Sequence, residues 1–306
     1  MSELPLSKIV HDRLDPRNDY FREAFQKRQI YLHHSYSHAD PATLIYRWRK
    51  TRSKVASALL VAGPSGHEDD QAADGTIFSA FASKYWAVHL GIHAEGNGLP
   101  ARYKKREHSR FLEKHSVSLQ ICSAGPLSWE NGKFYTRMRT VVPENQVIEY
   151  VDKFREKRFF QKYSSAQIES LRLLLHYLCD RYQIPRTYYP DMWDISENAL
   201  MGAPGIFTHV SVRTDKTDCH PQPELLHMLQ ELENEASSEP GNRVDSTSIL
   251  PDSLLSAEAE DPGAGETTEA EESSRSIKNE AEVAENGLAS GGEEETESAV
   301  SDKDPQ

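Results

Sequence analysis

The sequence of 306 residues has few cysteines and no long apolar segment. Its three cysteines, Cys122, Cys179 and Cys219, are widely separated and odd in number, which argues against a disulfide framework and favours a reducing compartment. The opening residues, MSELPLSKIVHDRLDP, contain no apolar run of signal-peptide length, and no run of roughly 18 apolar residues occurs elsewhere. We therefore expect a protein that is cytoplasmic as synthesised and that leaves the cell only by another export route or on lysis.

The last quarter of the sequence lacks aromatic residues and is strongly acidic. From Ser237 to Gln306 there are 19 Asp or Glu against 4 Lys or Arg, a net charge of −15. Because this composition cannot bury enough apolar surface to offset chain entropy, residues 237–306 are predicted to form a disordered acidic tail. The whole chain carries −13, so residues 1–236 carry +2 and are close to neutral. The tail is most simply a solubilising extension, and any partner of it is unknown.

Two short basic runs occur in the nearly neutral part, RWRKTRSK at 47–54 and RYKKR at 102–106. Such runs can attract an anionic polymer, but they are more often solvated faces. We therefore expect neither a nucleic-acid partner nor a membrane partner.

Residues 29–236 read as a succession of strands and helices. Before them, Asp15-Pro16 followed by Phe21 and Phe25 predicts a helix within an N-terminal extension, residues 1–28. Asn131-Gly132 within WENGKFY predicts a hairpin. Apolar runs and their punctuation predict strands in the segments 29–34, 54–66, 75–93, 115–125 and 205–212.

Helical patterns flank these strands. Pro41 begins an expected helix, and after Pro143 the pattern changes to helix. In SSAQIESLRLLLHYLCDRYQIP, Ser164 and Gln167 match a capping box ahead of an apolar stripe, and a closing helix starts at 223. The expected fold class is α/β (or α+β), a central mixed β-sheet flanked by helices, formed by residues 29–236.

Polar residues that suit a metal site recur near the predicted strand ends. Histidine nitrogen, thiolate and carboxylate are the usual zinc ligands, and a catalytic zinc needs only three protein ligands. The sequence has neither a Cys-x-x-Cys nor a His-Glu-x-x-His motif. By residue type alone, structural histidines, a buried thiol and an exposed charge pair are the simpler interpretation. The residues concerned are His33, His34, His89, His209, Lys216, Asp218 and Cys219.

Taken in order, several segments resemble a known family. They are IYLHHS, DGTIF, YWAVHLG, HSVSLQIC followed by GPL, AQIESLRLLLHYLCDRY, and THVSV leading to DKTD. Together they look like landmarks of the zinc-dependent N-acetylmuramoyl-L-alanine amidases of the type-2 amidase and peptidoglycan-recognition-protein superfamily. The resemblance runs from about residue 29 to about residue 225 and implies that family's fold, a Zn²⁺ cofactor, and peptidoglycan or muropeptide as the substrate.

The resemblance also implies a set of zinc ligands. The first zinc histidine of the family opens a His-His pair at a strand end, which is His33 here, and the second opens a His-x-x-Val stretch, which His209 matches. The third is an Asp or Cys two residues after a catalytic Lys or Thr. Asp218 after Lys216 is favoured because DKTD resembles the carboxylate branch of the family. Cys219 stays an alternative, since a thiolate is the softer zinc donor.

The implied reaction is hydrolysis of the amide between N-acetylmuramic acid and L-alanine. Zinc would polarise the amide carbonyl and acidify its bound water, while Lys216 would stabilise the developing oxyanion. Where the family has a general-base Glu, this chain has Gln120, whose amide is too weakly basic for that role at neutral pH. Zinc alone could suffice, or another group could have replaced the base: Glu95, Tyr36 or His34.

Further expectations concern the substrate-binding residues and the alternative functions. His34 and His89 are the expected substrate-binding residues, although a histidine on a half-buried strand is more often structural. The alternative function is a catalytically weak or inactive peptidoglycan-recognition module, for which Gln120 is the main argument. A third interpretation is a scaffold whose acidic tail engages partners; absence of bound zinc would favour it.

Overall fold

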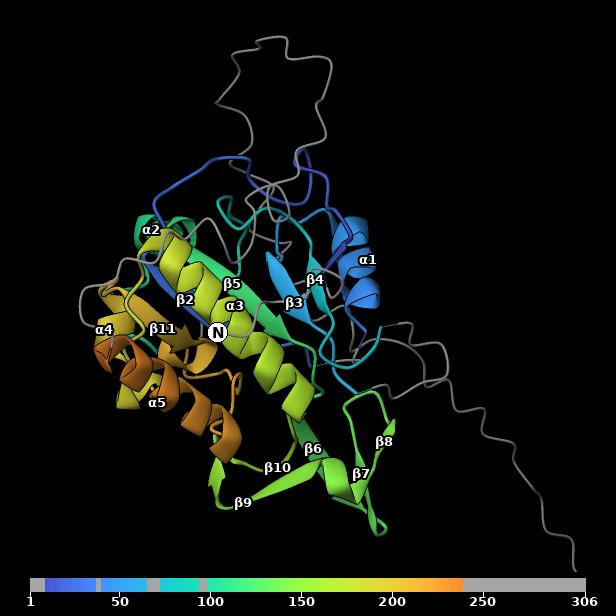
Figure 1. Cartoon of the computed structure of the whole chain (residues 1–306). Helices are drawn as coiled ribbons and strands as arrows, with labels where there is room; N and C mark the ends of the chain where they lie inside the picture. The colour runs from blue at the N-terminus through green and yellow to red at the C-terminus, as the bar shows by residue number, and fades with distance from the viewer. Residues whose placement is uncertain (1–8, 37–39, 65–71, 94–97, 239–306) are drawn as a thin grey trace, which may run out of the picture. The chain divides into compact units, whose positions relative to one another are not determined.

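The computed structural model describes residues 9–36, 40–64, 72–93 and 98–238 (Figure 1). The predicted acidic tail from residue 239 onward lies outside these residues, as does Glu95. Within the described ranges, no helix combines the length and the apolar character that crossing a membrane requires.

A six-stranded sheet forms the centre of the fold, in the order β1-β4-β3-β5-β2-β11. Every neighbouring pair is parallel except β3 with β4, which is antiparallel, so the sheet is mixed. Since β2, β5 and β11 are parallel neighbours, their carboxyl ends meet at one edge of the sheet. The strand bounds are β1 (Ile9–His11), β2 (Gln29–His34), β3 (Leu59–Val61), β4 (Ile77–Ser79), β5 (Ser116–Ile121) and β11 (Gly205–Thr208).

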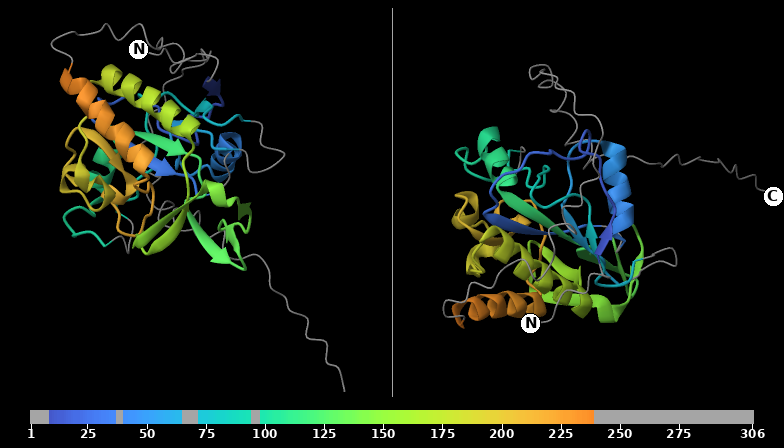
Figure 2. Two further views of the ribbon diagram at one scale, coloured as in Figure 1. Left: turned by 60° about the horizontal axis from the view of Figure 1, so that its bottom comes forward. Right: turned by 45° about the horizontal axis from the view of Figure 1, so that its top comes forward.

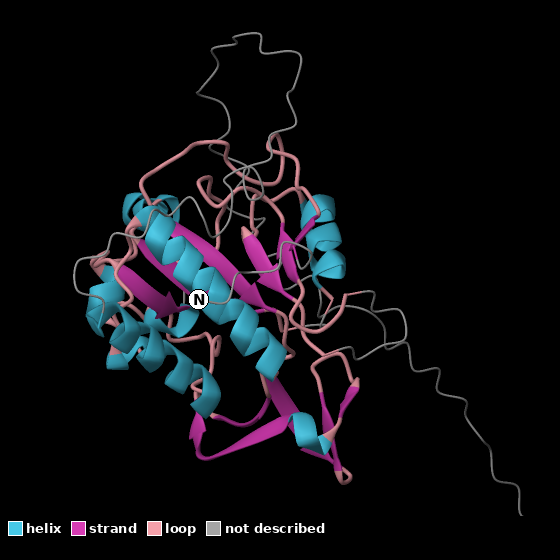
Figure 3. Cartoon of the chain, viewed as in Figure 1, coloured by secondary structure: helices cyan, strands magenta, loops and turns pink. Residues whose placement is uncertain are grey.

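Helices flank this sheet, which confirms the predicted fold class (Figure 3). Two of them, α3 (Ser165–Tyr182) and α5 (Pro223–Ser238), lie side by side over one face (Figures 1 and 2). Strands β2 and β5 are buried along their whole length, so any polar group on them needs an internal partner. The other helices are α1 (Pro41–Thr51), α2 (Arg106–Lys114) and α4 (Glu197–Leu200).

The predicted helix starts are confirmed by their caps. The Asp40 side chain accepts a hydrogen bond from the Ala42 N–H at the start of α1. At the start of α3, Ser164 and Gln167 form the reciprocal capping box, with distances of 3.0 and 3.1 Å.

A second sheet of five antiparallel strands has the order β8-β7-β6-β10-β9. The predicted hairpin at Asn131-Gly132 is confirmed, with φ values of 49° and 77° in the left-handed region. No strand was predicted between Pro143 and the helix that starts near residue 165, yet β9 and β10 lie there; no residue of β9 is fully buried, so it lacks a clear apolar signal. The bounds are β6 (Pro126–Glu130), β7 (Lys133–Tyr135), β8 (Val141–Val142), β9 (Val147–Phe154) and β10 (Lys157–Gln161).

The helix predicted within residues 1–28 is wrong. Residues 9–11 form β1 of the central sheet, and the chain beyond them makes a turn at 15–19 and then an extended segment. The ring of Phe21 stacks on Trp86 with 3.9 Å between centroids, and Lys27 donates to the carbonyls of Tyr85 and Lys114 at 2.9 and 2.8 Å. These tertiary contacts outweigh the weak helical preference of a short segment.

Candidate metal centre

Three neighbouring strands bring the site residues to one edge of the central sheet. Strand β2 ends in His33-His34, and β5 places Gln120 opposite His33 in register. On the other side of β2, β11 is followed at once by a 3₁₀ turn that starts with His209. The chain then returns, and the Val210 N–H donates to the Asp218 carbonyl at 3.0 Å, which anchors Asp218 beside this turn.

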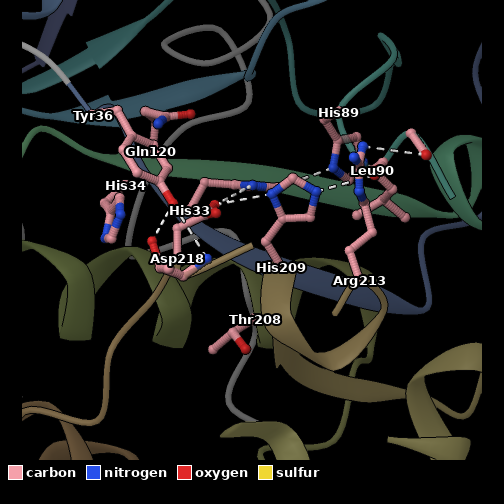
Figure 4. A network of polar contacts seen from close by, with 12 residues as sticks. His33, His34, Tyr36, His89, Leu90, Gln120, Thr208, His209, Arg213 and Asp218 are labelled. Atoms are coloured by element: carbon pink, nitrogen blue, oxygen red, sulfur yellow. Dashed lines mark hydrogen bonds and ion pairs between the residues drawn. The ribbon is translucent and has the colours of Figure 1, made fainter. Parts of the chain in front are cut away.

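His33, His209 and Asp218 form a compact buried cluster (Figure 4). The Nδ1 atoms of His33 and His209 lie 3.1 and 3.0 Å from the same carboxylate oxygen, Oδ2 of Asp218. One ligand atom from each residue lies within 4.8 Å of the others, and in the part of the chain that the structure describes this is the one such group. The structure thus brings together three residues that the resemblance implied as ligands.

The hydrogen bond on the far side of the His209 ring decides which of its nitrogens is free. Nε2 lies 3.0 Å from the Leu90 carbonyl oxygen, which can only accept, so Nε2 must carry the proton. In neutral His209 the lone pair is then on Nδ1, which faces Asp218 Oδ2. Two acceptors at 3.0 Å repel each other unless a proton or a metal cation lies between them.

His33 is oriented in the same way by a chain of hydrogen bonds. Its Nε2 lies 3.2 Å from Nδ1 of His89, and Nε2 of His89 lies 2.9 Å from Oγ of Ser116. Ser116 in turn donates to the carbonyl of Glu113 at 3.4 Å. Because this chain ends on an acceptor, every donor can point along it, and in that tautomer Nδ1 of His33 is free to bind a cation in place of its hydrogen bond to Asp218. Partners of this kind commonly fix metal-binding histidines.

The donor set fits a small divalent cation. Two imidazole nitrogens and one carboxylate oxygen converge, and the second carboxylate oxygen, Oδ1 of Asp218, is buried without a hydrogen-bond partner among the described residues. Nitrogen and oxygen donors of this number and type suit zinc, with a fourth position left for water or substrate.

The electrostatics of His33 and Asp218 favour metal binding. Burial lowers the pKa of His33 to about 4 against the hydrogen bond and charge of Asp218, which raise it, so this imidazole is neutral at pH 7. Burial raises the pKa of Asp218, but the charge and hydrogen bond of His209 and the hydrogen bond of His33 outweigh it and hold that pKa well below its usual range. The site therefore offers the neutral imidazole of His33 beside the ionised carboxylate of Asp218.

Cys219 does not join this cluster. Its side chain is fully buried and interacts with Tyr163, and burial raises the pKa of the thiol well above its ordinary value. A thiol kept protonated is a poor ligand. Of the two candidates for the third metal ligand, the structure places Asp218 beside the two histidines.

The two residues expected to bind substrate lie in different surroundings. His89 lies on the side of the His33 ring opposite Asp218, where it orients that ring. His34 lies beside the cluster, with Nδ1 3.2 Å from the Tyr163 hydroxyl and its ring edge-on to Tyr36 at 4.7 Å. Contact of either histidine with a substrate stays a prediction.

Gly125 makes room for the His34 ring, which gives a testable prediction. A Cβ at Gly125 would lie 2.4 Å from His34 Nε2, and its φ is +66°. Gly125→Ala should therefore lower the free energy of unfolding by about 2–4 kcal/mol, as backbone strain and overpacking add. Gly132→Ala is the matched control: its φ is +77° but nothing lies within 4 Å, so about 1–2 kcal/mol is expected. Urea unfolding measures both, and equal losses would contradict the steric argument.

Gln120 and Lys216 lie around the cluster without joining it. Oε1 of Gln120 accepts a hydrogen bond from Ser57 Oγ at 3.1 Å, so the amide group left for the site is the NH₂. Lys216 is half-buried, and its positive charge acts on His33. The remaining polar group of Gln120 is thus a donor, and Lys216 supplies a cationic charge that acts on the cluster.

The structure also bears on the substitutes considered for the missing base. Burial raises the pKa of the Tyr36 hydroxyl far above neutrality, so this group stays protonated. Its hydroxyl contacts Oγ1 of Thr217 and accepts from the Thr217 N–H, which holds the segment leading to Asp218. Burial lowers the pKa of His34 to about 4, so that ring is neutral but weakly basic.

Sequence reasoning missed the backbone carbonyl of Leu90 and the hydroxyls of Ser57 and Ser116. A carbonyl carries no side-chain signal, and serines in strands are common. The nearest clue was His89 in YWAVHLG. It was expected to bind substrate, whereas in the structure it orients the His33 ring.

No protein-family model matches this chain, and no curated protein matches it. Among solved structures, PlyL is similar over 76% of this chain and 98% of its own, with 14% identity and a TM-score of 0.39. A mutant structure of PlyL is similar over 73% and 92%, with 13% identity and a TM-score of 0.37.

A third similar structure is the N-acetylmuramyl-L-alanine amidase AmiD from E. coli in complex with the substrate anhydro-N-acetylmuramic acid-L-Ala-D-gamma-Glu-L-Lys. It is similar over 72% of this chain and 62% of its own, with 15% identity and a TM-score of 0.36. At this level of similarity, function must be argued from the residues of the site itself.

Proposed function

We propose that this protein is a zinc-dependent amidase that hydrolyses the amide between N-acetylmuramic acid and L-alanine in peptidoglycan or muropeptides. The observation that carries the proposal is the convergence of the Nδ1 atoms of His33 and His209 on one carboxylate oxygen of Asp218. Three ligands with an open fourth position are typical of hydrolytic zinc sites. The ordered resemblance of residues 29–225 to zinc amidases supplies the substrate class.

Other residues of this chain have separate roles in the proposed reaction. A zinc ion held by the three ligands supplies Lewis-acid polarisation of the scissile carbonyl and lowers the pKa of water. Lys216, two residues before Asp218, places a positive charge where negative charge develops on the carbonyl oxygen. Tyr36 holds the intervening Thr217 in place. Gln120, turned by Ser57 so that it presents N–H groups, can orient water but cannot take its proton.

The second candidate function is a peptidoglycan-recognition module with little or no activity. Gln120 favours it, because the position of the expected base carries an amide. The two functions differ in one measurable respect: both bind the peptide-bearing sugar, but only the amidase releases soluble peptide from it.

Metal removal tests the proposed function directly. Incubating the full-length chain with peptidoglycan should release soluble stem peptides. Dialysis against a chelator should reduce this release by at least about 100-fold, and one equivalent of Zn²⁺ should restore it. Mg²⁺ is the control cation, since it prefers all-oxygen sites. Release that persists without metal would contradict the mechanism, and zinc binding without release would favour the recognition module.

A further inference from the structure

One short turn, His89-Leu90-Gly91, holds the partners of both metal-facing histidines (Figure 4). His89 Nδ1 lies 3.2 Å from Nε2 of His33, and the Leu90 carbonyl lies 3.0 Å from Nε2 of His209. A shift of this turn would therefore rotate both imidazole rings and move both Nδ1 atoms away from Asp218.

The turn is fixed by a carboxyl group that has no role in the chemistry described so far. Glu113, in the last turn of α2, is 1% exposed. Its Oε1 accepts from the N–H groups of Leu90 and Gly91 at 3.4 and 3.3 Å, and the His89 N–H also hydrogen-bonds to this carboxyl group. A carboxyl group removed from water is unfavourable unless its oxygens are satisfied, and here backbone N–H groups of the turn satisfy one of them.

Arg213 holds the same turn from its other side. Its Nη1 donates to the Gly91 carbonyl at 3.3 Å, while Nε and Nη2 pair with Asp215 at 2.9 and 2.6 Å. Gly91 has a φ of +58°, and a Cβ there would lie 2.7 Å from Nη1 of Arg213. An oxygen of Glu113 thus holds the N–H groups of the turn and the Arg213 guanidinium holds its last carbonyl, so the turn has little freedom to shift.

We infer that Glu113 is a positioning residue for the metal centre, acting through the 89–91 turn on His33 and His209 together. This inference rests on the metal site of the proposed function, but it does not depend on the reaction. The inference depends on the side-chain length that brings Oε1 of Glu113 to the N–H groups of Leu90 and Gly91, because both hydrogen bonds go to this one oxygen.

Three substitutions separate reach, charge and size. Glu113→Gln keeps an acceptor at the same reach and removes the charge, Glu113→Asp keeps the charge but is one methylene too short, and Glu113→Met keeps the approximate size without an acceptor. Zinc affinity of the full-length chain is measured by competition with a chromophoric chelator. We expect the zinc affinity of Glu113→Gln to stay within about threefold of wild type, and Glu113→Asp and Glu113→Met to bind zinc about 10–100-fold more weakly. Co²⁺ absorption should show an altered ligand geometry in Glu113→Asp and Glu113→Met only.

Leu112→Ala is the matched control, because Leu112 is a buried neighbour on α2 that belongs to the core. It should lower Tm without changing zinc affinity by more than about threefold. The inference is overturned if folded Glu113→Asp or Glu113→Met binds zinc as tightly as wild type. It is also overturned if these variants lose no more zinc affinity than Leu112→Ala does at a similar Tm. If Glu113→Met does not fold, Glu113→Asp alone decides the test. A wild-type chain that binds no zinc refutes the metal site itself, whereas zinc binding without peptide release refutes only the amidase.

Discussion

Replacing Asp218 by asparagine should remove zinc from the protein, while replacing its neighbour Cys219 by serine should not. Asp218 contributes the only carboxylate oxygen of the cluster, at 3.0–3.1 Å from both histidine nitrogens, whereas Cys219 interacts with Tyr163. An amide is a poor zinc ligand, so D218N should lose at least about 100-fold in zinc affinity and at least about 1000-fold in peptide release. Metal analysis of the purified chain and a peptide-release assay measure the two effects.

The D218N protein should fold without metal but should be less stable than the metal-free wild type. In the wild-type apoprotein the ionised Asp218 carboxylate is hydrogen-bonded by His33 and His209, which hold its pKa well below the usual range, so removing its charge removes folding free energy. We therefore expect the Tm of metal-free D218N to lie below that of the metal-free wild type. Adding zinc should raise Tm for wild type and C219S but not for D218N. Loss of zinc in C219S with retention in D218N would make the thiolate the third ligand and refute the assignment.

Restoring a carboxylate at position 120 should increase the rate of hydrolysis. Gln120 is next to His33 in the sheet register and presents an amide where a general base is expected. General-base catalysis typically contributes about 10²–10⁴-fold. Gln120→Glu should therefore raise kcat for peptide release by roughly tenfold or more, with a rate that increases with pH as the new carboxyl group ionises.

The control for this gain is Gln120→Leu, which has a similar size and no acceptor. It should fall below wild type if Gln120 orients water, and zinc affinity should stay unchanged in both variants because residue 120 is not a ligand. An unchanged rate in Gln120→Glu, with zinc bound, would mean that another group already acts as the base. Absence of release from both wild type and Gln120→Glu would instead support the recognition module.

Local sequence features predicted most of the fold. The strand 29–34, the capping box at Ser164 and the Asn131-Gly132 turn all rest on short-range geometry, and the structure contains each of them. The failures have tertiary causes. The segment around Phe21 is extended because it packs on Trp86, and β9 is a strand by pairing with β10 rather than by an apolar pattern of its own.

The site was predictable only in part, for a related reason. The ordered resemblance pointed to His33, His209 and, by preference, Asp218, but the sequence could not exclude Cys219 as the third ligand, since both residues lie at permitted spacings. That choice depends on which side chain turns toward the histidines after the 3₁₀ turn. Glu113 could not be found from sequence, because its partners are backbone N–H groups and carry no residue signature.

By itself, the sequence determined the chemical inventory of this protein: a near-neutral domain of alternating strands and helices, an acidic tail, and histidines and carboxylates at the ends of strands. Only the tertiary structure decided which of these groups meet and which nitrogen of each imidazole faces the Asp218 carboxylate. The physical reason is that ring orientation is set by partners far along the chain. His209 takes its direction from the Leu90 carbonyl, and His33 from His89 and Ser116.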